Sequence, residues 1–225
     1  MVKNKNQIES RAGSQRGQAQ RVGIFGASGS GKTTKARELT KNLKRIVYFD
    51  PLGDFVNVRG VKVVNGDIAA LKAFIIKHYT AGFKAVFIPV FGQQEKQLND
   101  VCYFLVEMQR GYLAGFHDAQ ITLLVDELDE GFYSGIMQRD AKNGFGYLCK
   151  RGRHYGINLV GISQRTAQVD VCFRGNLSAL YLFRHVDPID TQKAMDMIGR
   201  KYKTAFENLE NYHYFFKSGG FVVQK

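Results

Sequence analysis

Short apolar runs alternate with helical patterns along most of this chain. Runs rich in β-branched and aromatic residues predict strands, and they cover residues 22–25, 46–49, 61–64, 85–90, 121–125, 158–162 and 179–183. Between these runs, apolar residues at helical spacing predict helices over residues 32–43, 68–79, 95–115, 147–151 and 189–198. Strands that alternate with helices in this way indicate an α/β protein with a mainly parallel central sheet flanked by helices.

The two ends of the chain depart from this alternation. Residues 1–20 are rich in Gln, Ser, Gly and Asn and contain few large apolar side chains, so they predict a mobile basic and polar arm. Residues 212–217 and 221–224, joined by Ser218-Gly219-Gly220, are typical of a C-terminal β-hairpin. A chain of 225 residues has room for one sizeable core, so we expect a single domain over residues 21–225.

The net charge and the cysteine content indicate the kind of binding partner and the cellular environment of this protein. The chain carries 32 Lys and Arg against 20 Asp and Glu, a formal net charge of +12, which favours a polyanionic partner such as DNA. No run approaches the roughly 18 apolar residues of a membrane-spanning helix, and the three cysteines form no C-x-x-C pair. We therefore expect a soluble protein with reduced thiols in a cytoplasm and no transmembrane segment of its own.

The strongest chemical signal follows the first predicted strand. Residues 26–33 read G-A-S-G-S-G-K-T, which satisfies the phosphate-binding pattern G-x-x-x-x-G-K-[ST] between a strand and a helix. In such a loop the backbone N–H groups and the helix N-terminus bind phosphates, Lys32 reaches the β- and γ-phosphates, and Thr33 ligates Mg²⁺. The residues expected to bind ATP are Gly26, Ala27, Ser28, Gly29, Ser30, Gly31, Lys32, Thr33 and Thr34. The alternative is an ordinary glycine-rich turn.

Polar side chains that suit hydrolysis end two later strands. Asp126 and Glu127 follow the apolar run 121–125, where Asp126 can support Mg²⁺ and Glu127 can polarise the attacking water. Gln164 comes just after the run 158–162 and can sense the γ-phosphate or its water. Ligands of parallel α/β sheets lie outside the carboxyl ends of the strands, so we expect these side chains to converge on one nucleotide. The alternatives are a plain strand-to-turn exit for the acidic pair and a solvated strand end for Gln164.

An arginine that acts across subunits is the last expected member of the catalytic set, with Lys32, Glu127 and Gln164. Arg153 lies just before the run 158–162 and can project toward a neighbouring subunit's phosphates as an arginine finger. Its rivals for this role are Arg151, Arg165 and Arg174. Contact with DNA phosphate or a surface ion pair is the alternative for each of them.

The order of these motifs resembles that of the HerA/FtsK superfamily of DNA-pumping ATPases, and within it the small viral genome-packaging ATPases of tectivirus-type, membrane-containing icosahedral viruses. The resemblance covers about residues 20–200 and is carried by residues 26–33, 48–55, 123–127 and 152–156 through 163–165. One position departs from the family pattern Asp-Pro-x-Gly-Glu-aromatic, since Asp54 stands where Glu is common. This conservative change neither adds nor removes catalytic capacity.

The resemblance implies a single RecA-like domain of the ASCE type that works as a homo-oligomeric ring, usually a hexamer, and translocates double-stranded DNA with ATP and Mg²⁺. For the viral members it implies genome packaging into a preformed capsid, with capsid-vertex or membrane-associated packaging proteins as partners. The place of action would be the host cytoplasm or the virion at a packaging vertex. Two alternatives remain open, namely a plasmid or conjugative DNA pump with the same core and a nucleotide-gated tether between DNA and capsid that is not a motor.

Overall fold

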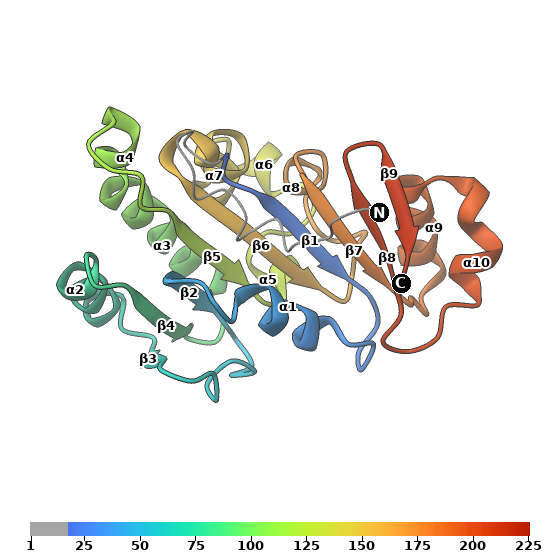
Figure 1. The fold of residues 1–225 in the computed structure, drawn as a ribbon, viewed down its shortest axis with the longest axis horizontal. Helices are drawn as coiled ribbons and strands as arrows, with labels where there is room; N and C mark the ends of the chain where they lie inside the picture. The colour runs from blue at the N-terminus through green and yellow to red at the C-terminus, as the bar shows by residue number, and fades with distance from the viewer. Residues whose placement is uncertain (1–17) are drawn as a thin grey trace.

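The computed structural model describes residues 18–225, and these form one nine-stranded sheet in the order β3-β4-β2-β5-β6-β1-β7-β8-β9 (Figure 1). The strands from β3 to β7 in this order run parallel, whereas β8 and β9 pair antiparallel. Their bounds are β1 Arg21–Phe25, β2 Arg45–Phe49, β3 Lys62–Asn65, β4 Phe83–Ile88, β5 Ile121–Val125, β6 Ile157–Ser163, β7 Ala179–Phe183, β8 Tyr214–Ser218 and β9 Phe221–Gln224. The predicted α/β class with a mainly parallel sheet is confirmed.

Most of the helices lie in connections between the parallel strands, and α9 and α10 lie between β7 and the antiparallel β8. Their bounds are α1 Lys32–Thr40, α2 Ile68–His78, α3 Gln94–Met108, α4 Arg110–Ala114, α5 Leu128–Gly131, α6 Ile136–Arg139, α7 Gly144–Arg151, α8 Val171–Arg174, α9 Pro188–Ile198 and α10 Lys203–Glu207, with 3-10 turns η1 Gly152–Tyr155 and η2 Arg200–Tyr202. The sequence patterns did not predict α5, α6, α8 and α10, which have only four or five residues each. A single turn of helix is too short to display a helical period.

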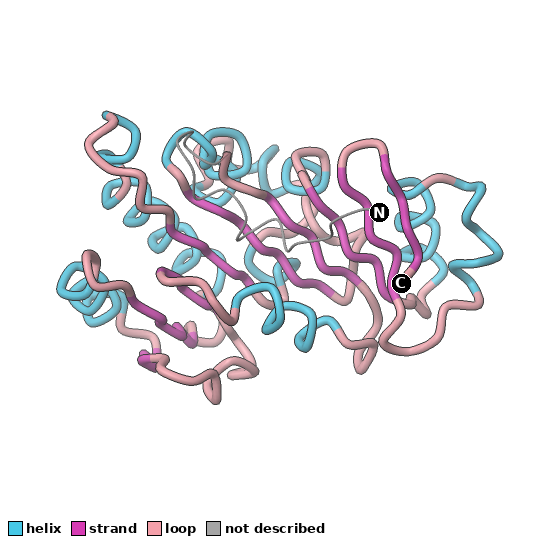
Figure 2. Tube along the Cα trace, in the orientation of Figure 1, coloured by secondary structure: helices cyan, strands magenta, loops and turns pink. Residues whose placement is uncertain are grey.

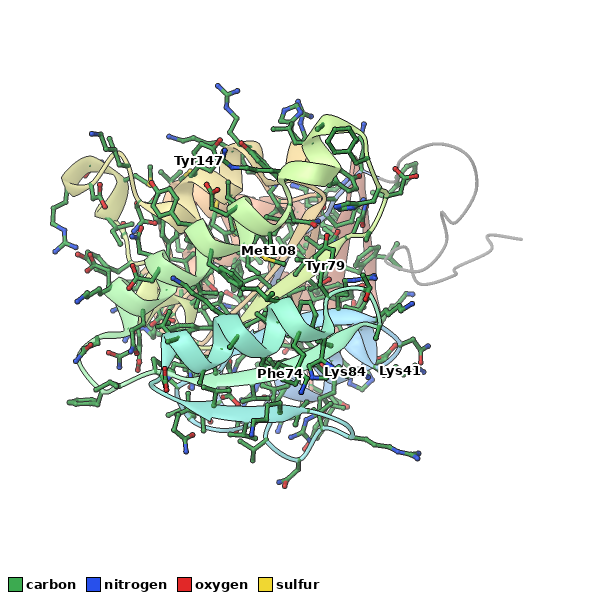
Figure 3. The ribbon with its side chains drawn as sticks, turned by 90° about the vertical axis from the view of Figure 1, so that its left-hand side faces the viewer. Lys41, Phe74, Tyr79, Lys84, Met108 and Tyr147 are labelled. Atoms are coloured by element: carbon green, nitrogen blue, oxygen red, sulfur yellow. The ribbon has the colours of Figure 1, made fainter. Side chains whose placement is uncertain are left out.

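The prediction of one continuous helix over residues 95–115 is wrong, because the helix breaks at Gln109. The side chain of this buried residue accepts a hydrogen bond from the Tyr79 hydroxyl (2.5 Å) and donates one to the Ala119 carbonyl (2.9 Å). These bonds tie residue 109 to the end of α2 and to the segment before β5, and the chain turns there from α3 into α4 with φ −99° and ψ 12°. Figure 3 looks onto this end of the sheet, where Tyr79 and Met108 are partly buried against the core.

The core lies on both faces of the sheet. On one face α1 buries Ala36 and Leu39 against strand residues such as Ile24 and Tyr48. On the other face α2, α3, α7 and α9 pack over a larger apolar cluster, and Figure 2 shows most of the helices on that side. Strand β6 is buried along its whole length, as expected for a central strand that is covered on both faces. This burial fixes where each strand ends, and therefore where the polar residues that follow each strand lie.

The two ends of the described chain both attach to this sheet. The predicted C-terminal hairpin is confirmed, with a turn at Gly219-Gly220, although its first strand begins at Tyr214 rather than at residue 212 and includes Ser218. Near the start, the Gln20 N–H donates to Oδ1 of Asn158, a residue of β6 (2.7 Å). Residues 1–17 of the predicted arm lie outside the described residues. None of the helices in residues 18–225 combines the length and apolar character that crossing a bilayer requires.

Candidate nucleotide-binding and hydrolysis site

The predicted site residues follow three neighbouring strands. Strand β6 lies between β1 and β5 and pairs in parallel with both, so their carboxyl ends meet at one edge of the sheet, the lower edge in Figure 1. The phosphate-binding loop, residues 26–31, follows β1, Gln164 follows β6, and the pair Asp126-Glu127 follows β5. The fold thus brings together at the ligand-binding edge three segments that lie far apart in the sequence.

The phosphate-binding loop is anchored on both sides and open at its centre. The Gly26 N–H donates to the Ser163 carbonyl (3.3 Å), and the Ala27 N–H donates to the Arg184 carbonyl (2.8 Å). Gly31 has φ 109°, a left-handed conformation that glycine adopts without strain. No side chain caps the start of α1, so the N–H groups of its first turn are available to an anion, which the helix dipole also favours.

Lys32 and Ser30 place polar groups inside this loop. The Lys32 side chain is buried, and its Nζ donates to the Ala27 carbonyl (2.8 Å) across the loop. Burial lowers the pKa of Lys32, while the negative charges of Glu127 and Asp126 oppose that shift. Among the described residues, buried side-chain atoms without a hydrogen-bond partner are the Ser30 hydroxyl and Nε of Arg184. Buried polar groups without partners are rare and costly, so these two atoms fit a site built for a phosphate-bearing ligand.

The acidic pair after β5 has two different environments. Asp126 is 4% exposed, and burial, followed by the charge of Glu127, raises its pKa to about 7. Glu127 has φ 44°, a left-handed conformation that is rare for a residue with a side chain, and its Oε1 accepts a hydrogen bond from Gln164 Nε2 (2.5 Å). Burial raises the pKa of Glu127, and the bond from Gln164 acts against this. Backbone strain of this kind concentrates at functional sites.

Thr33, Asp126 and the loop together could hold Mg²⁺ with a nucleotide. Thr33 is the second residue of α1 and half-buried, and Thr34 is exposed beside it. Hydroxyl and carboxylate oxygens are the ligands that Mg²⁺ prefers, and Mg²⁺ usually binds through one or two of them plus substrate phosphates. The donor set therefore fits the ion, which when bound would neutralise charge on the phosphates.

Residues that the sequence analysis did not single out support this site. The Ser163 hydroxyl donates to Asp129 Oδ1 (2.6 Å) and accepts from the Arg165 N–H (2.9 Å), so it joins the start of α5 to the turn after β6. Arg184 flanks the loop on the β7 side through its carbonyl. The available sequence signal was position, since Ser163 ends a predicted strand and Arg184 follows another at the same edge of the sheet.

The structure separates the four candidate arginines. Arg153 lies on η1, before β6, and is exposed, so the seven residues of β6, at a rise of roughly 3.3 Å each, set it about 20 Å from its own phosphate-binding loop. Arg151 is also exposed, at the end of α7. Arg165 forms an ion pair with buried Asp190 (2.8 Å), and Arg174 Nε donates to the Val169 carbonyl (2.8 Å). The latter two are therefore held by contacts within the subunit.

Asp126 provides a test of these electrostatics that needs no ligand. Its pKa is about 7 in the folded chain and 3.8 ordinarily, so between these values the folded state binds the extra proton and stability falls as pH rises. We expect Asp126→Asn to raise the free energy of unfolding at both pH values, by about 1.5 kcal/mol at pH 5 and about 4 kcal/mol at pH 8, because the cost of ionising Asp126 accumulates from pH 3.8 up to about pH 7. Urea unfolding at the two pH values measures this difference.

Glu207→Gln is the matched control for this measurement. Glu207 is exposed on α10, with its carboxylate 3.8 Å from Lys203 Nζ, and exposed ion pairs contribute little to stability. We expect its effect to stay below about 0.5 kcal/mol at both pH values. An equal effect of Asp126→Asn at pH 5 and pH 8 would contradict the electrostatic account.

The fold and the loop define a class of protein. The chain has the single RecA-like domain of P-loop ATPases, with the phosphate-binding loop between β1 and α1 and a C-terminal antiparallel hairpin. No protein-family model matches the sequence, and no curated protein matches it. Solved structures do match, at low sequence identity.

The structural neighbours include a genome packaging NTPase, a Type VII secretion ATPase and VirB4. The genome packaging NTPase B204 from Sulfolobus turreted icosahedral virus 2, in complex with ATP-gammaS, is similar with a TM-score of 0.69 and 12% identity, over 91% of this chain and 96% of that chain. VirB4 of Thermoanaerobacter pseudethanolicus has a TM-score of 0.62 and 13% identity, with 94% and 90% covered. The cytoplasmic domain of the Type VII secretion ATPase EccC of Thermomonospora curvata has a TM-score of 0.59 and 15% identity, over 93% of this chain and 25% of that chain. The resemblance in motif order is thereby matched by a shared fold.

Proposed function

We propose that this chain is an ATPase that uses hydrolysis to translocate double-stranded DNA, in the packaging of a viral genome into a capsid. The observation that carries the proposal is the convergence at one sheet edge of the phosphate-binding loop, the buried Asp126 and the Gln164–Glu127 hydrogen bond. The neighbours crystallised with ATP analogues support hydrolysis of ATP. The excess of basic residues, 32 against 20, supports a polyanionic substrate.

The roles follow from the positions of the side chains. The loop and Lys32 bind the phosphates, Thr33 and Asp126 hold Mg²⁺, and Glu127 accepts a proton from the attacking water. Gln164 already bonds to Glu127, so it orients that carboxylate toward the attacking water. Arg153 acts on the nucleotide of the neighbouring subunit in a homo-oligomeric ring. We assign the ATPase domain to residues 21–225 and the basic and polar arm to residues before it, with Gln20 already bonded to Asn158 of β6.

The extent of structural similarity to B204 favours a packaging ATPase over a conjugative pump. B204, which is named as a genome packaging NTPase, is matched over 96% of its length with a TM-score of 0.69, and this supports the packaging role. The catalytic residues of the two kinds of pump would be identical, so a capsid-binding assay separates them. The proposal implies a hexamer, partners at a capsid vertex or on a membrane, and action in the host cytoplasm or at the virion.

ATP turnover with linear double-stranded DNA tests the motor. We expect the full chain to hydrolyse ATP faster when DNA is present, and this stimulation should fall as the salt concentration rises. The turnover per subunit should also rise with protein concentration, because neighbouring subunits complete each other's sites. Phosphate release across protein and salt concentrations measures this, with Lys32→Ala as the inactive control. ATP binding without turnover, with or without DNA, would contradict the motor and favour a nucleotide-gated tether.

A further inference from the structure

The segment that leads into β8 lies directly on the phosphate-binding loop. The Tyr212 N–H donates to the Ser30 carbonyl (3.0 Å). A Cβ placed on Gly31 would lie 2.9 Å from Tyr212 Cδ1 and 3.5 Å from its Cα, so the tyrosine ring contacts the loop backbone at the start of α1. Figure 1 shows the same approach, with the loop after β1 beside the segment that runs into β8 at the lower edge of the sheet.

Tyr212 is held in this place at an energetic cost. Its φ is 68°, and in residues 18–225 the other non-glycine residue with positive φ is Glu127. A bulky side chain in this region is strained, and such strain clusters at ligand sites. The ring is nevertheless 68% exposed, so burial of the ring does not compensate for the strain.

The strand that follows Tyr212 is packed against β7 and α1. Two residues later, the Tyr214 ring lies 5.2 Å from the Phe183 ring, centroid to centroid, and Lys35 Nζ of α1 lies 4.7 Å from the Tyr214 centroid. Strand β8 pairs with β7, which ends beside the loop. One side of the Tyr212 ring therefore rests on a fixed support, and the rest of it is open to solvent.

The order of the strands around the site indicates which part of a bound nucleotide lies near the Tyr212 ring. Glu127 and Gln164 follow β5 and β6, on one side of β1, and mark the γ-phosphate end. Tyr212 precedes β8, on the other side of β1 beyond β7. A triphosphate that lies along the loop with its γ-phosphate toward Glu127 extends its nucleoside toward the β7 and β8 side.

We propose that Tyr212 is the platform on which the base of the bound nucleotide stacks. An exposed tyrosine offers an aromatic face to a base, and stacking of this kind contributes substantially to nucleotide binding. The assignment rests on the proposed function, because it takes the phosphate position from the ATP-binding loop. It adds a base-binding contact to a site that the sequence motifs describe only at its phosphates.

The absence of tryptophan from the chain allows a direct optical test. Tyr212→Trp introduces a single indole at the proposed platform. We expect ATP to quench its fluorescence by stacking, and inorganic tripolyphosphate, which has no base, to leave it nearly unchanged. Phe221→Trp is the matched control, since Phe221 is exposed at 81% on β9, and its emission should not respond to either ligand.

Calorimetric binding of ATP and tripolyphosphate separates stacking from a structural role. We expect Tyr212→Gly, which keeps the backbone conformation without strain, to bind ATP about tenfold more weakly and to bind tripolyphosphate like the wild type. Tyr212→Phe should bind both like the wild type. Equal weakening of both ligands, or unchanged ATP affinity in Tyr212→Gly, would overturn the stacking role while leaving the ATPase proposal intact. A wild-type chain that binds neither ligand would overturn the proposed function itself and this inference with it.

Discussion

Substitution of Glu127 by glutamine is expected to lower DNA-stimulated ATP turnover by about 10²–10⁴-fold, the range that a positioned general base contributes. The carboxylate that follows β5 is placed by its left-handed backbone (φ 44°) and by the bond from Gln164. Glutamine has the same shape and its amide oxygen can accept that bond, so the geometry is kept and only the proton acceptor is lost. ATP affinity should therefore stay close to that of the wild type, because the loop and Lys32 are unchanged.

Two measurements together decide this prediction. Steady-state phosphate release with DNA gives the loss of turnover, and calorimetry gives the ATP affinity of the same protein. Glu130→Gln is the matched control, since Glu130 is an exposed carboxylate on α5 three residues further on and should retain nearly full turnover. Residual activity of Glu127→Gln within tenfold of the wild type would show that another group accepts the proton.

The motifs and the strand segments were predictable because both are local. Gly26, Asp126 and Gln164 each come directly after a strand. Their positions in the sequence therefore assigned them to the edge of the sheet where the nucleotide binds. A parallel sheet then brings their ends together whatever the connections between them. The structure agrees with this reasoning, since β6 lies between β1 and β5 and Gln164 bonds to Glu127.

The parts that sequence could not supply depend on contacts between distant segments. Tyr212 lies 181 positions after Gly31, and nothing in its own neighbourhood indicates that it packs on the phosphate-binding loop. The break at Gln109 likewise coincides with a hydrogen bond from Tyr79, 30 residues away. Local periodicity continues through residue 109, and the tertiary bond overrides it.

Loss of the arginine finger is expected to be as severe as loss of the general base. An arginine that stabilises transition-state charge on a neighbour's phosphates contributes about 10³–10⁵ in turnover, so Arg153→Ala should nearly abolish DNA-stimulated hydrolysis while ATP still binds. Arg153 is exposed at the sheet edge opposite its own loop, and Arg165 and Arg174 are already engaged within the subunit. Arg151→Ala, two residues away and equally exposed, is the matched comparison, and its turnover should stay close to the wild type.

Mixing two inactive variants tests whether the arginine acts between subunits. The Arg153→Ala subunit has an intact phosphate-binding loop, and the Lys32→Ala subunit has an intact Arg153. An interface is therefore complete where an Arg153→Ala subunit binds the nucleotide and a Lys32→Ala subunit supplies the arginine. In a head-to-tail ring mixed at random, about a quarter of interfaces have this composition, and the mixture should regain turnover that neither variant shows alone. An arginine that served its own subunit would give no recovery, because every Arg153→Ala subunit would then lack its finger whichever neighbour it had. Loss of turnover in Arg151→Ala instead of Arg153→Ala would transfer the role to Arg151, and the same mixing experiment with Arg151→Ala would then distinguish action between subunits from action within one.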